Sequence, residues 1–263
     1  MIDNAYMLKA KRQKSAKKKP KIAVCLYGHL RTYKECAPFL KYNLLSYYDC
    51  DLFMHTWSKF DHSTPTWHDY KKVRGDVTEE ELIKTYGEFK NIIIEEQIIE
   101  DLGVTTDLCE QVSIYSIFGV KSAFYSRYKA CEITQKYAEK NNITYDYIFF
   151  IRPDIWLKIP FLLEEFIKNT KTDINKTIFT FARHHPDVAL ATIDIVFYAK
   201  MNTMFKLMDS TEKTIEKLLN YTWPNYNPEC SFDQQVTLSG LFFKSLFDFE
   251  IEKHWTIKRM KEK

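Results

Sequence analysis

The chain has 263 residues, of which 45% are hydrophobic and 16% aromatic, so it can bury a sizeable core in one large domain or two small ones. A formal net charge of +3 is nearly neutral for this length, and the body of the chain carries no basic stripe with interleaved aromatics. This composition argues against nucleic acid as a partner. Only 6 glycines are present, which argues against glycine-rich phosphate loops.

The hydropathy pattern excludes a membrane-spanning protein. The longest apolar runs fall far short of the ~20 residues that a membrane helix needs. The first 21 residues are polar and basic, unlike the apolar core of a signal peptide. The six cysteines show no C-x-x-C pairing, so we expect free thiols in a reducing compartment. A cytoplasmic location is therefore expected.

Basic residues gather at both ends of the chain. We expect residues 1–20 to form a basic flexible tail, 21–257 the folded domain, and 258–263 a basic C-terminal tail. Solvated, frayed ends are the simplest interpretation. The alternative is attachment to anionic lipid, at ~1 kcal/mol per basic residue near the surface, which would place the protein at the inner face of the cytoplasmic membrane.

Strand and helix patterns alternate along the chain. Apolar runs predict strands over 21–27, 51–57, 91–95, 145–151, 177–181 and 193–198, with a last one between 245 and 257. Helices are predicted over 32–45 with Thr32 as the N-cap, and over 78–86, 111–140, 160–169, 201–221 and 230–241; residues 58–76 read as a loop. Such alternation favours βαβ units, hence a mainly parallel sheet flanked by helices.

The segment from Tyr145 to Trp156 is the most informative part of the sequence. A continuous apolar run, typical of a central strand, leads into Arg152-Pro153-Asp154, and the proline ends regular pairing there. In open α/β sheets, ligands bind at the carboxyl ends of strands. A cation and an anion at such an edge suit a substrate with phosphates and hydroxyls, although an Arg–Asp pair closing a surface turn would look the same.

Polar motifs also close the first two strands. Gly28-His29-Leu30-Arg31-Thr32 follows the first, His55-Thr56-Trp57 ends the second, and a later helix carries Tyr125-Ser126-Arg127-Tyr128-Lys129-Ala130. Over residues 21–157 this order resembles a group of bacterial and viral proteins from capsule and lipopolysaccharide gene clusters that are assigned as glycosyltransferases. Those proteins share a G-x-L/M-R-T loop, a D-I/L/V-F-x-H-T-W strand and a late Y-D-x-I/V-x-R-x-R-x-D segment.

The resemblance implies a GT-A-like fold, in which the nucleotide of a diphospho-sugar donor lies over the carboxyl ends of the first strands. An acidic D-x-D motif there usually binds a divalent metal. In this chain Arg152 replaces the first acid and only Asp154 matches. Asp154 could supply one carboxylate to Mn²⁺ or Mg²⁺, or Arg152 or Arg31 could instead bind the phosphates bidentately.

Two sets of candidate site residues follow. The candidates for donor binding are Gly28, His29, Arg31, Thr32, His55, Ser126, Lys129, Arg152 and Asp154. Each also has an ordinary structural interpretation, such as a turn glycine, a surface ion pair, a structural histidine or a solvated lysine. The candidates for the catalytic base are Asp194, an acid inside an apolar strand pattern, and Glu229 and Asp233, which share one helical face.

The expected activity is transfer of a sugar from a nucleotide-diphospho-sugar donor to a surface polysaccharide or a lipid-linked glycan. Transfer of a phosphorus-containing substituent onto a capsule sugar is one alternative. A nucleotide- or sugar-binding module without turnover, and a membrane-docked scaffold, are the others.

Overall fold

The computed structural model describes residues 4–16, 18–61, 73–98, 117–168, 170–182, 192–211 and 228–259. The centre of the loop expected over 58–76, the beginning of the helix expected from 111, and the second half of the helix expected over 201–221 lie outside these ranges.

The described strands form a seven-stranded sheet in the order β3-β2-β1-β4-β7-β6-β8. The strands of its first half are β1 (Lys21–Tyr27), β2 (Asp49–Trp57), β3 (Asn91–Glu95) and β4 (Tyr147–Ile151), all parallel. Those of its second half are β6 (Thr177–Ala182), β7 (Thr192–Ala199) and β8 (Phe242–Glu250), of which only β7 runs against the others. The expected α/β fold with a mixed, mainly parallel central sheet flanked by helices is confirmed.

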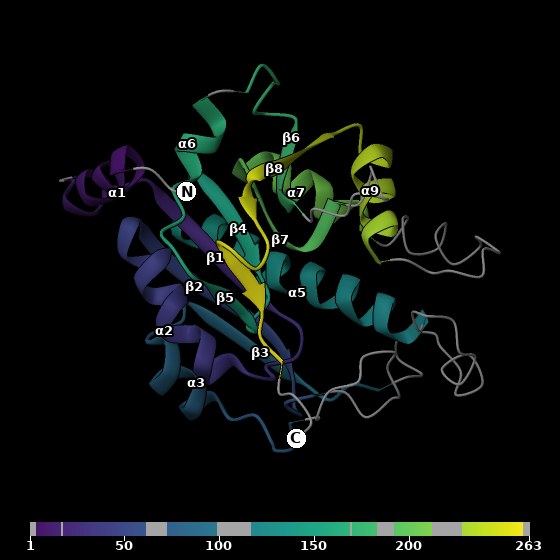
Figure 1. Cartoon of the computed structure of the whole chain (residues 1–263). Helices are drawn as coiled ribbons and strands as arrows, with labels where there is room; N and C mark the ends of the chain where they lie inside the picture. The colour runs from purple at the N-terminus through teal and green to yellow at the C-terminus, as the bar shows by residue number, and fades with distance from the viewer. Residues whose placement is uncertain are drawn as a thin grey trace.

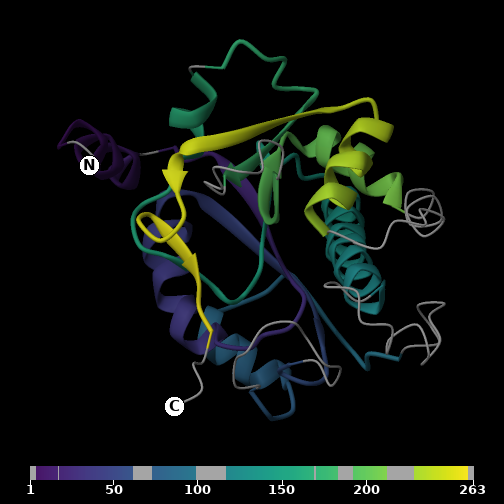
Figure 2. The same cartoon turned by 45° about the vertical axis from the view of Figure 1, so that its right-hand side comes forward.

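Helices cover both faces of this sheet (Figure 1). On one side lie α2 (Tyr33–Asn43), the short 3₁₀ helix η1 (Leu45–Tyr47), α3 (Glu79–Tyr86) and α6 (Leu163–Lys168). On the other lie α5 (Ile117–Asn141), α7 (Met201–Asp209) and α9 (Pro228–Leu238), and Figure 2 shows the same separation. Two hydrophobic clusters fill the layers, with Val24 in one and Cys25 in the other. The alternation along β1 is that of a strand buried on both faces.

A small second sheet pairs β5 (Ile155–Leu157) with β9 (Trp255–Ile257). The single strand expected between 245 and 257 is therefore two, β8 and β9, separated by a turn in which Glu252 has φ 64. β5 and β9 have three residues each, which is too few for a periodic signal in the sequence. This is why neither β5 nor β9 was expected as a separate strand.

The N-terminal segment contains helix α1 (Asn4–Ser15), where sequence reasoning expected a flexible tail. An apolar contact and a hydrogen bond anchor it: Ala10 is buried, and the Tyr6 hydroxyl donates to the Pro160 carbonyl at 2.8 Å. Lys9 adds an ion pair with Glu165. Basic composition predicted solvation, but these contacts with the domain hold the helix.

Two further expectations can be compared with the structure. The four cysteines whose side chains are described, Cys25, Cys36, Cys50 and Cys131, are free thiols as expected. Within the described ranges, no helix has the length and apolar character to cross a membrane.

Candidate functional site

The carboxyl ends of β1 and β4 form the centre of the candidate site. These strands are neighbours in the sheet although β2 and β3 come between them in the chain, so the strand order reverses at this pair. Open α/β sheets bind ligands in the crevice outside such a switch point. The segments that follow the two strands are Gly28–Thr32 and Arg152–Asp154, both of which the sequence singled out.

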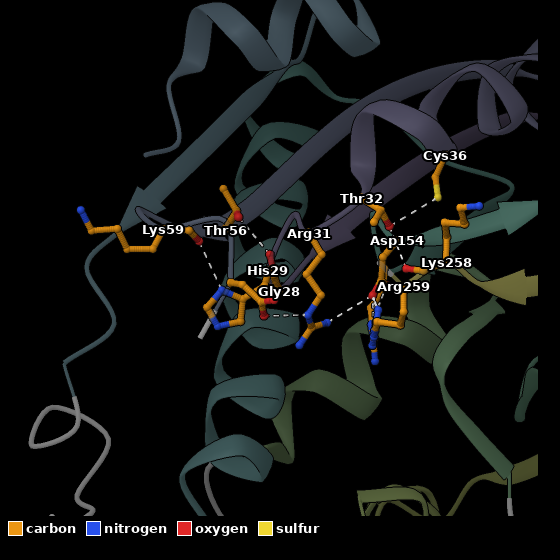
Figure 3. Close-up of polar contacts among 12 residues, drawn as sticks. Gly28, His29, Arg31, Thr32, Cys36, Thr56, Lys59, Asp154, Lys258 and Arg259 are labelled. Carbon is orange, nitrogen blue, oxygen red and sulfur yellow. Dashed lines mark hydrogen bonds and ion pairs between the residues drawn. The ribbon is translucent and has the colours of Figure 1, made fainter. Parts of the chain in front are cut away.

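Three arginines converge on the carboxylate of Asp154, which is completely buried. Arg152 binds it bidentately, with Nε at 3.0 Å from Oδ1 and Nη2 at 2.6 Å from Oδ2. Arg31 Nη1 lies 3.2 Å from Oδ2, and Arg259 forms an ion pair with the same oxygen. Figure 3 shows Arg31 extending toward Asp154 from the segment Gly28–Thr32, which we call the first loop, with Arg259 beside Asp154. We call this group the arginine cluster. It consists of Arg31, Arg152, Arg259, Asp154 and Asp61, the last of which pairs with Arg31.

The arginine cluster carries an excess of positive charge. Arg31 also pairs through Nε with Asp61 Oδ1 at 3.1 Å. Three guanidiniums therefore face two carboxylates, which leaves a formal charge of +1. The arginine side chains are only 13–19% exposed, so solvent screens them weakly. A surplus cation at a strand-end crevice favours an anionic ligand.

The small sheet positions the C-terminal part of the cluster. β5 begins directly after Asp154 and pairs antiparallel with β9, and the Lys258 N–H continues the ladder by donating to the Asp154 carbonyl at 2.8 Å. The Thr32 hydroxyl donates to the Lys258 carbonyl at 2.8 Å. Arg259 is thereby placed beside Asp154, although sequence reasoning assigned it to a C-terminal tail and missed it as a site residue.

Thr32 does not act as the expected side-chain cap. It stands at the N-cap position of α2, but its hydroxyl makes no capping bond. The bond to Lys258 uses that hydroxyl instead, because the C-terminal segment lies across the start of α2. Thr78, by contrast, caps α3 with its side chain, accepting from the Glu81 N–H at 3.3 Å.

The loop after β1 has an unusual backbone. Gly28 has φ 83, which favours glycine, and a Cβ placed there would meet no atom within 4 Å. Arg31 has φ 46, in the left-handed region that residues other than glycine rarely adopt. Its N–H donates to the Phe60 carbonyl at 2.9 Å, which fixes this conformation. Strain of this kind is found where a side chain must be aimed at a ligand or partner.

Hydrogen bonds with Ser126, and through it with His55, support this loop. The Gly28 N–H donates to Ser126 Oγ at 2.7 Å, and Ser126 Oγ lies 2.8 Å from His55 Nδ1. His55 Nε2 lies 3.3 Å from Glu95, which also accepts from the Tyr125 hydroxyl at 2.8 Å. Both Ser126 and His55 are fully buried. They therefore support the loop through hydrogen bonds. Glu95, which sequence reasoning missed, is the last residue in this series of hydrogen bonds.

Burial controls the charge state of His55. Desolvation lowers the pKa of His55 below its ordinary value, against the opposing effect of Glu95. The hydrogen bond from His55 lowers the pKa of Glu95 in turn. The consistent arrangement is a neutral imidazole that donates from Nε2 to an ionised Glu95 and accepts from Ser126 at Nδ1.

Other predicted residues take different positions. His29 belongs to the first loop itself, and Nδ1 of its ring lies 3.3 Å from the Lys59 carbonyl (Figure 3). Lys129 pairs with Glu132 on its own helix at 2.8 Å. Glu229 and Asp233 lie near the start of α9, which packs on β7.

Asp194 lies at the same sheet edge as the arginine cluster. It is next to Ile195, whose carbonyl accepts from the Arg152 N–H at 3.2 Å. The Asp194 carbonyl accepts from the Tyr27 hydroxyl at 2.7 Å, and its carboxylate lies 3.5 Å from Nη1 of Arg127. The structure thus brings Asp194 near the ends of β1 and β4.

A divalent metal does not fit the described residues as they stand. Mn²⁺ or Mg²⁺ would need carboxylate oxygens with open positions, whereas both oxygens of Asp154 accept hydrogen bonds from guanidiniums. No group of three or more His, Cys, Asp and Glu side chains suited to a metal occurs in the described ranges. The cluster has the donors for an anion rather than the acceptors for a cation.

Comparisons with known proteins give the following. No family model and no curated protein matches the chain. Among solved structures, a glycosyltransferase involved in the glycosylation of the major capsid of PBCV-1 matches with TM-score 0.42 and 12% identity, over 90% of this chain and 92% of that one. The glycosyltransferase GlyE of Streptococcus pneumoniae TIGR4 matches in its apo form with TM-score 0.46 and 11% identity, over 88% of this chain and 46% of GlyE. Because both TM-scores lie below 0.5, the function has to be argued from the residues of the site.

Proposed function

We propose that the chain is a glycosyltransferase that uses a nucleotide-diphospho-sugar donor and binds the donor's diphosphate at the arginine cluster. The observation that carries the proposal is the convergence of Arg31, Arg152 and Arg259 on one buried carboxylate at the switch point of the sheet. The resemblance of the strand-end motifs to capsule-cluster glycosyltransferases supports it independently.

The chemistry of sugar transfer needs what this cluster offers. Breaking the bond between a sugar and a diphosphate places negative charge on the departing oxygen, and fixed cations stabilise that charge. Arginine forks match phosphate oxygens bidentately. The carboxylate of Asp154 already engages Arg31 and Arg152 with the bidentate and single contacts that a phosphate would use. We therefore favour an arginine-bound diphosphate over one bound through Mn²⁺ or Mg²⁺.

The polar network beneath the first loop has a supporting role in this proposal. Ser126 and His55 fix Gly28, and the absence of atoms within 4 Å of its Cβ position lets a ligand approach the backbone. Arg31 then projects from the same loop into the cluster.

Three acids are proposed for the carboxylate that takes the proton from the acceptor hydroxyl: Asp194, Glu229 and Asp233. An amide variant of the true base should lower kcat and leave nucleotide binding unchanged. Asp194→Asn, Glu229→Gln and Asp233→Asn, each assayed for both quantities, would separate them.

The acceptor is proposed to be a surface polysaccharide or a lipid-linked glycan at the inner face of the cytoplasmic membrane. Helix α1 supports this, because Lys11 and Arg12 are exposed beside Met7 and Leu8, which are 40% and 56% exposed. Basic and apolar side chains together suit an anionic lipid surface. Lys11→Glu with Arg12→Glu should reduce sedimentation with phosphatidylglycerol vesicles and leave phosphatidylcholine vesicles unaffected.

The direct test is a thermal-shift panel followed by a turnover assay. UDP, GDP, CMP, TDP and ADP and their common sugar conjugates would be added to the protein with EDTA, Mg²⁺ or Mn²⁺. A ligand at 100 times its Kd should add about 2.7 kcal/mol of stability. We expect one nucleotide to stabilise the protein in EDTA and its sugar conjugate to be consumed when a glycan acceptor is supplied.

Other outcomes would favour the alternatives. Stabilisation that requires metal would assign Asp154 to a metal ion. Consumption of a donor without a sugar would indicate transfer of a phosphorus-containing substituent. Nucleotide binding without turnover would indicate a binding module, and no shift with any nucleotide would contradict the proposal and leave the membrane scaffold.

A further inference from the structure

Arg127 is a buried cation whose hydrogen bonds are incomplete. It lies on α5, is 1% exposed, and uses only Nη1, which donates to the Asp194 carbonyl at 3.2 Å. Nε and Nη2 have no hydrogen-bond partner anywhere in the part of the chain that the structure describes. A buried N–H without a partner costs about 1–3 kcal/mol, and native proteins rarely leave one so. An acceptor other than the described residues is therefore expected for these bonds.

The open groups form one fork. Nε–H and the N–H of Nη2 that lies beside it point the same way, as the side-on edge of the guanidinium. This edge binds two acceptor oxygens in parallel. The rest of the guanidinium is enclosed by aromatic rings, with Phe124 at 4.2 Å and Phe232 at 5.1 Å from its carbon to the ring centroids. The rings fix the orientation of the fork.

The local charge indicates which oxygens fit. The carboxylate of Asp194 lies 3.5 Å from Nη1, so Arg127 and Asp194 together are neutral, in contrast to the surplus cation of the arginine cluster. A second anion would face Asp194 without compensation. A pair of hydroxyls fits instead, because each oxygen accepts from the fork as a neutral group and adds no second negative charge near Asp194.

The pair lies beside the arginine cluster. The hydroxyl of Tyr27 donates a hydrogen bond to the Asp194 carbonyl, and Tyr27 is the residue directly before Gly28. Ile195, which follows Asp194, accepts at its carbonyl from the Arg152 N–H at 3.2 Å. Burial chiefly raises the pKa of Tyr27, Arg127 lowers it, Asp194 raises it and Arg152 lowers it, so the hydroxyl lies near the charged groups of both sites. A ligand with phosphates at one site can therefore present another part of itself to the other.

We propose that the open fork of Arg127, which Asp194 holds in place through Nη1, binds two neighbouring hydroxyl groups of the transferred sugar. This inference rests on the proposed function and assigns a second part of the donor to the chain. Asp194 then holds the guanidinium of Arg127 in position, and removal of the acceptor proton falls to Glu229 or Asp233.

The test compares a nucleotide with its own sugar conjugate. Isothermal titration would measure the Kd of UDP against UDP-glucose and of GDP against GDP-mannose, for the wild type, Arg127→Lys and Asp194→Asn. Arg127→Lys keeps the charge and loses the fork, and Asp194→Asn gives a second variant that does not remove the buried cation. Arg74→Lys, an exposed arginine, is the matched control.

For one pair we expect the sugar conjugate to bind more tightly than the nucleotide alone. Each site variant should weaken the conjugate at least 10-fold and the nucleotide less than 2-fold, with the control unchanged. Equal weakening of nucleotide and conjugate, or a variant with the wild-type preference for the conjugate, would overturn the subsite and leave the proposed function standing. If the wild type binds neither nucleotides nor conjugates, the proposed function fails and the subsite fails with it.

Discussion

The arginine cluster and the Arg127–Asp194 pair lie at the same sheet edge but are built in opposite ways. In the first, a completely buried carboxylate is surrounded by guanidiniums, and both of its oxygens accept hydrogen bonds. In the second, a completely buried guanidinium is surrounded by aromatic rings and keeps an open fork. The first site has surplus charge and the second has surplus hydrogen-bonding capacity. Two parts of one ligand, a charged one and a hydroxylated one, would satisfy both.

The comparison predicts its largest effect at Asp154. Asp154→Ala would leave Arg31, Arg152 and Arg259 facing one another without their shared anion. Removing one partner of a buried ion pair costs about 3–5 kcal/mol. Urea unfolding would measure the loss of stability. Asp49→Ala, whose side chain is 62% exposed in an ion pair with Lys21, should change stability by less than ~1 kcal/mol. A loss below ~1 kcal/mol at Asp154 would mean that water compensates the arginines.

At the second site the cation is already unsatisfied, so its removal should cost less. Arg127→Met fills the aromatic enclosure with an apolar chain but leaves the carboxylate of Asp194 without its partner. We expect a loss of about 1–3 kcal/mol in urea unfolding, because one buried polar group loses its bond. Adding Asp194→Asn should recover most of it, since replacing a buried pair as a whole is often neutral. A double variant less stable than either single one would contradict this description.

Removing a hydrogen-bond partner of the first loop should have an intermediate effect on the free energy of unfolding. Ser126→Ala removes the acceptor of the Gly28 N–H and the partner of His55 Nδ1 inside the protein. The expected cost is about 1–3 kcal/mol of unfolding free energy. Ser15→Ala, at an exposed helix end, is the control. Faster amide exchange at Gly28 in Ser126→Ala, but not in Ser15→Ala, would locate the loss in the loop.

The smallest effect is the pH dependence that His55 introduces. Its pKa is lower in the folded protein than in the unfolded chain, so the unfolded state binds the proton more readily. Stability from this residue is complete above the unfolded pKa and is lost as the pH falls below it. His55→Gln should therefore flatten the decline in unfolding free energy between pH 7 and pH 5. An unchanged slope would show that folding does not lower the pKa of His55.

The sequence predicts the sheet well because its signals are local. Continuous apolar runs such as Ile148–Ile151 identify buried strands, and alternation with helices indicates parallel pairing. The strand-end residues Gly28, Arg31, Arg152 and Asp154 follow from the same reasoning, since strand ends meet at one edge.

What sequence reasoning missed depends on tertiary contacts. Arg259 reaches Asp154 only through the pairing of β5 with β9, whose strands are too short for a periodic signal. Arg127 lies inside a motif that was noticed, but its burial among rings from Phe124 and Phe232 requires the packing of α9. The hydroxyl of Thr32 binds Lys258 rather than capping α2 for the same reason, because residues far apart in the chain meet there.

The most direct test of the central claim is the Kd of the stabilising nucleoside diphosphate in EDTA and in Mg²⁺, for the wild type and Arg259→Gln. If the arginine cluster binds the diphosphate, the wild-type Kd is the same in both solutions. Arg259→Gln then weakens binding about 10- to 150-fold, the equivalent of a charged hydrogen bond of about 1.5–3 kcal/mol. Binding that requires Mg²⁺, or an Arg259→Gln variant that binds like the wild type, would contradict the account.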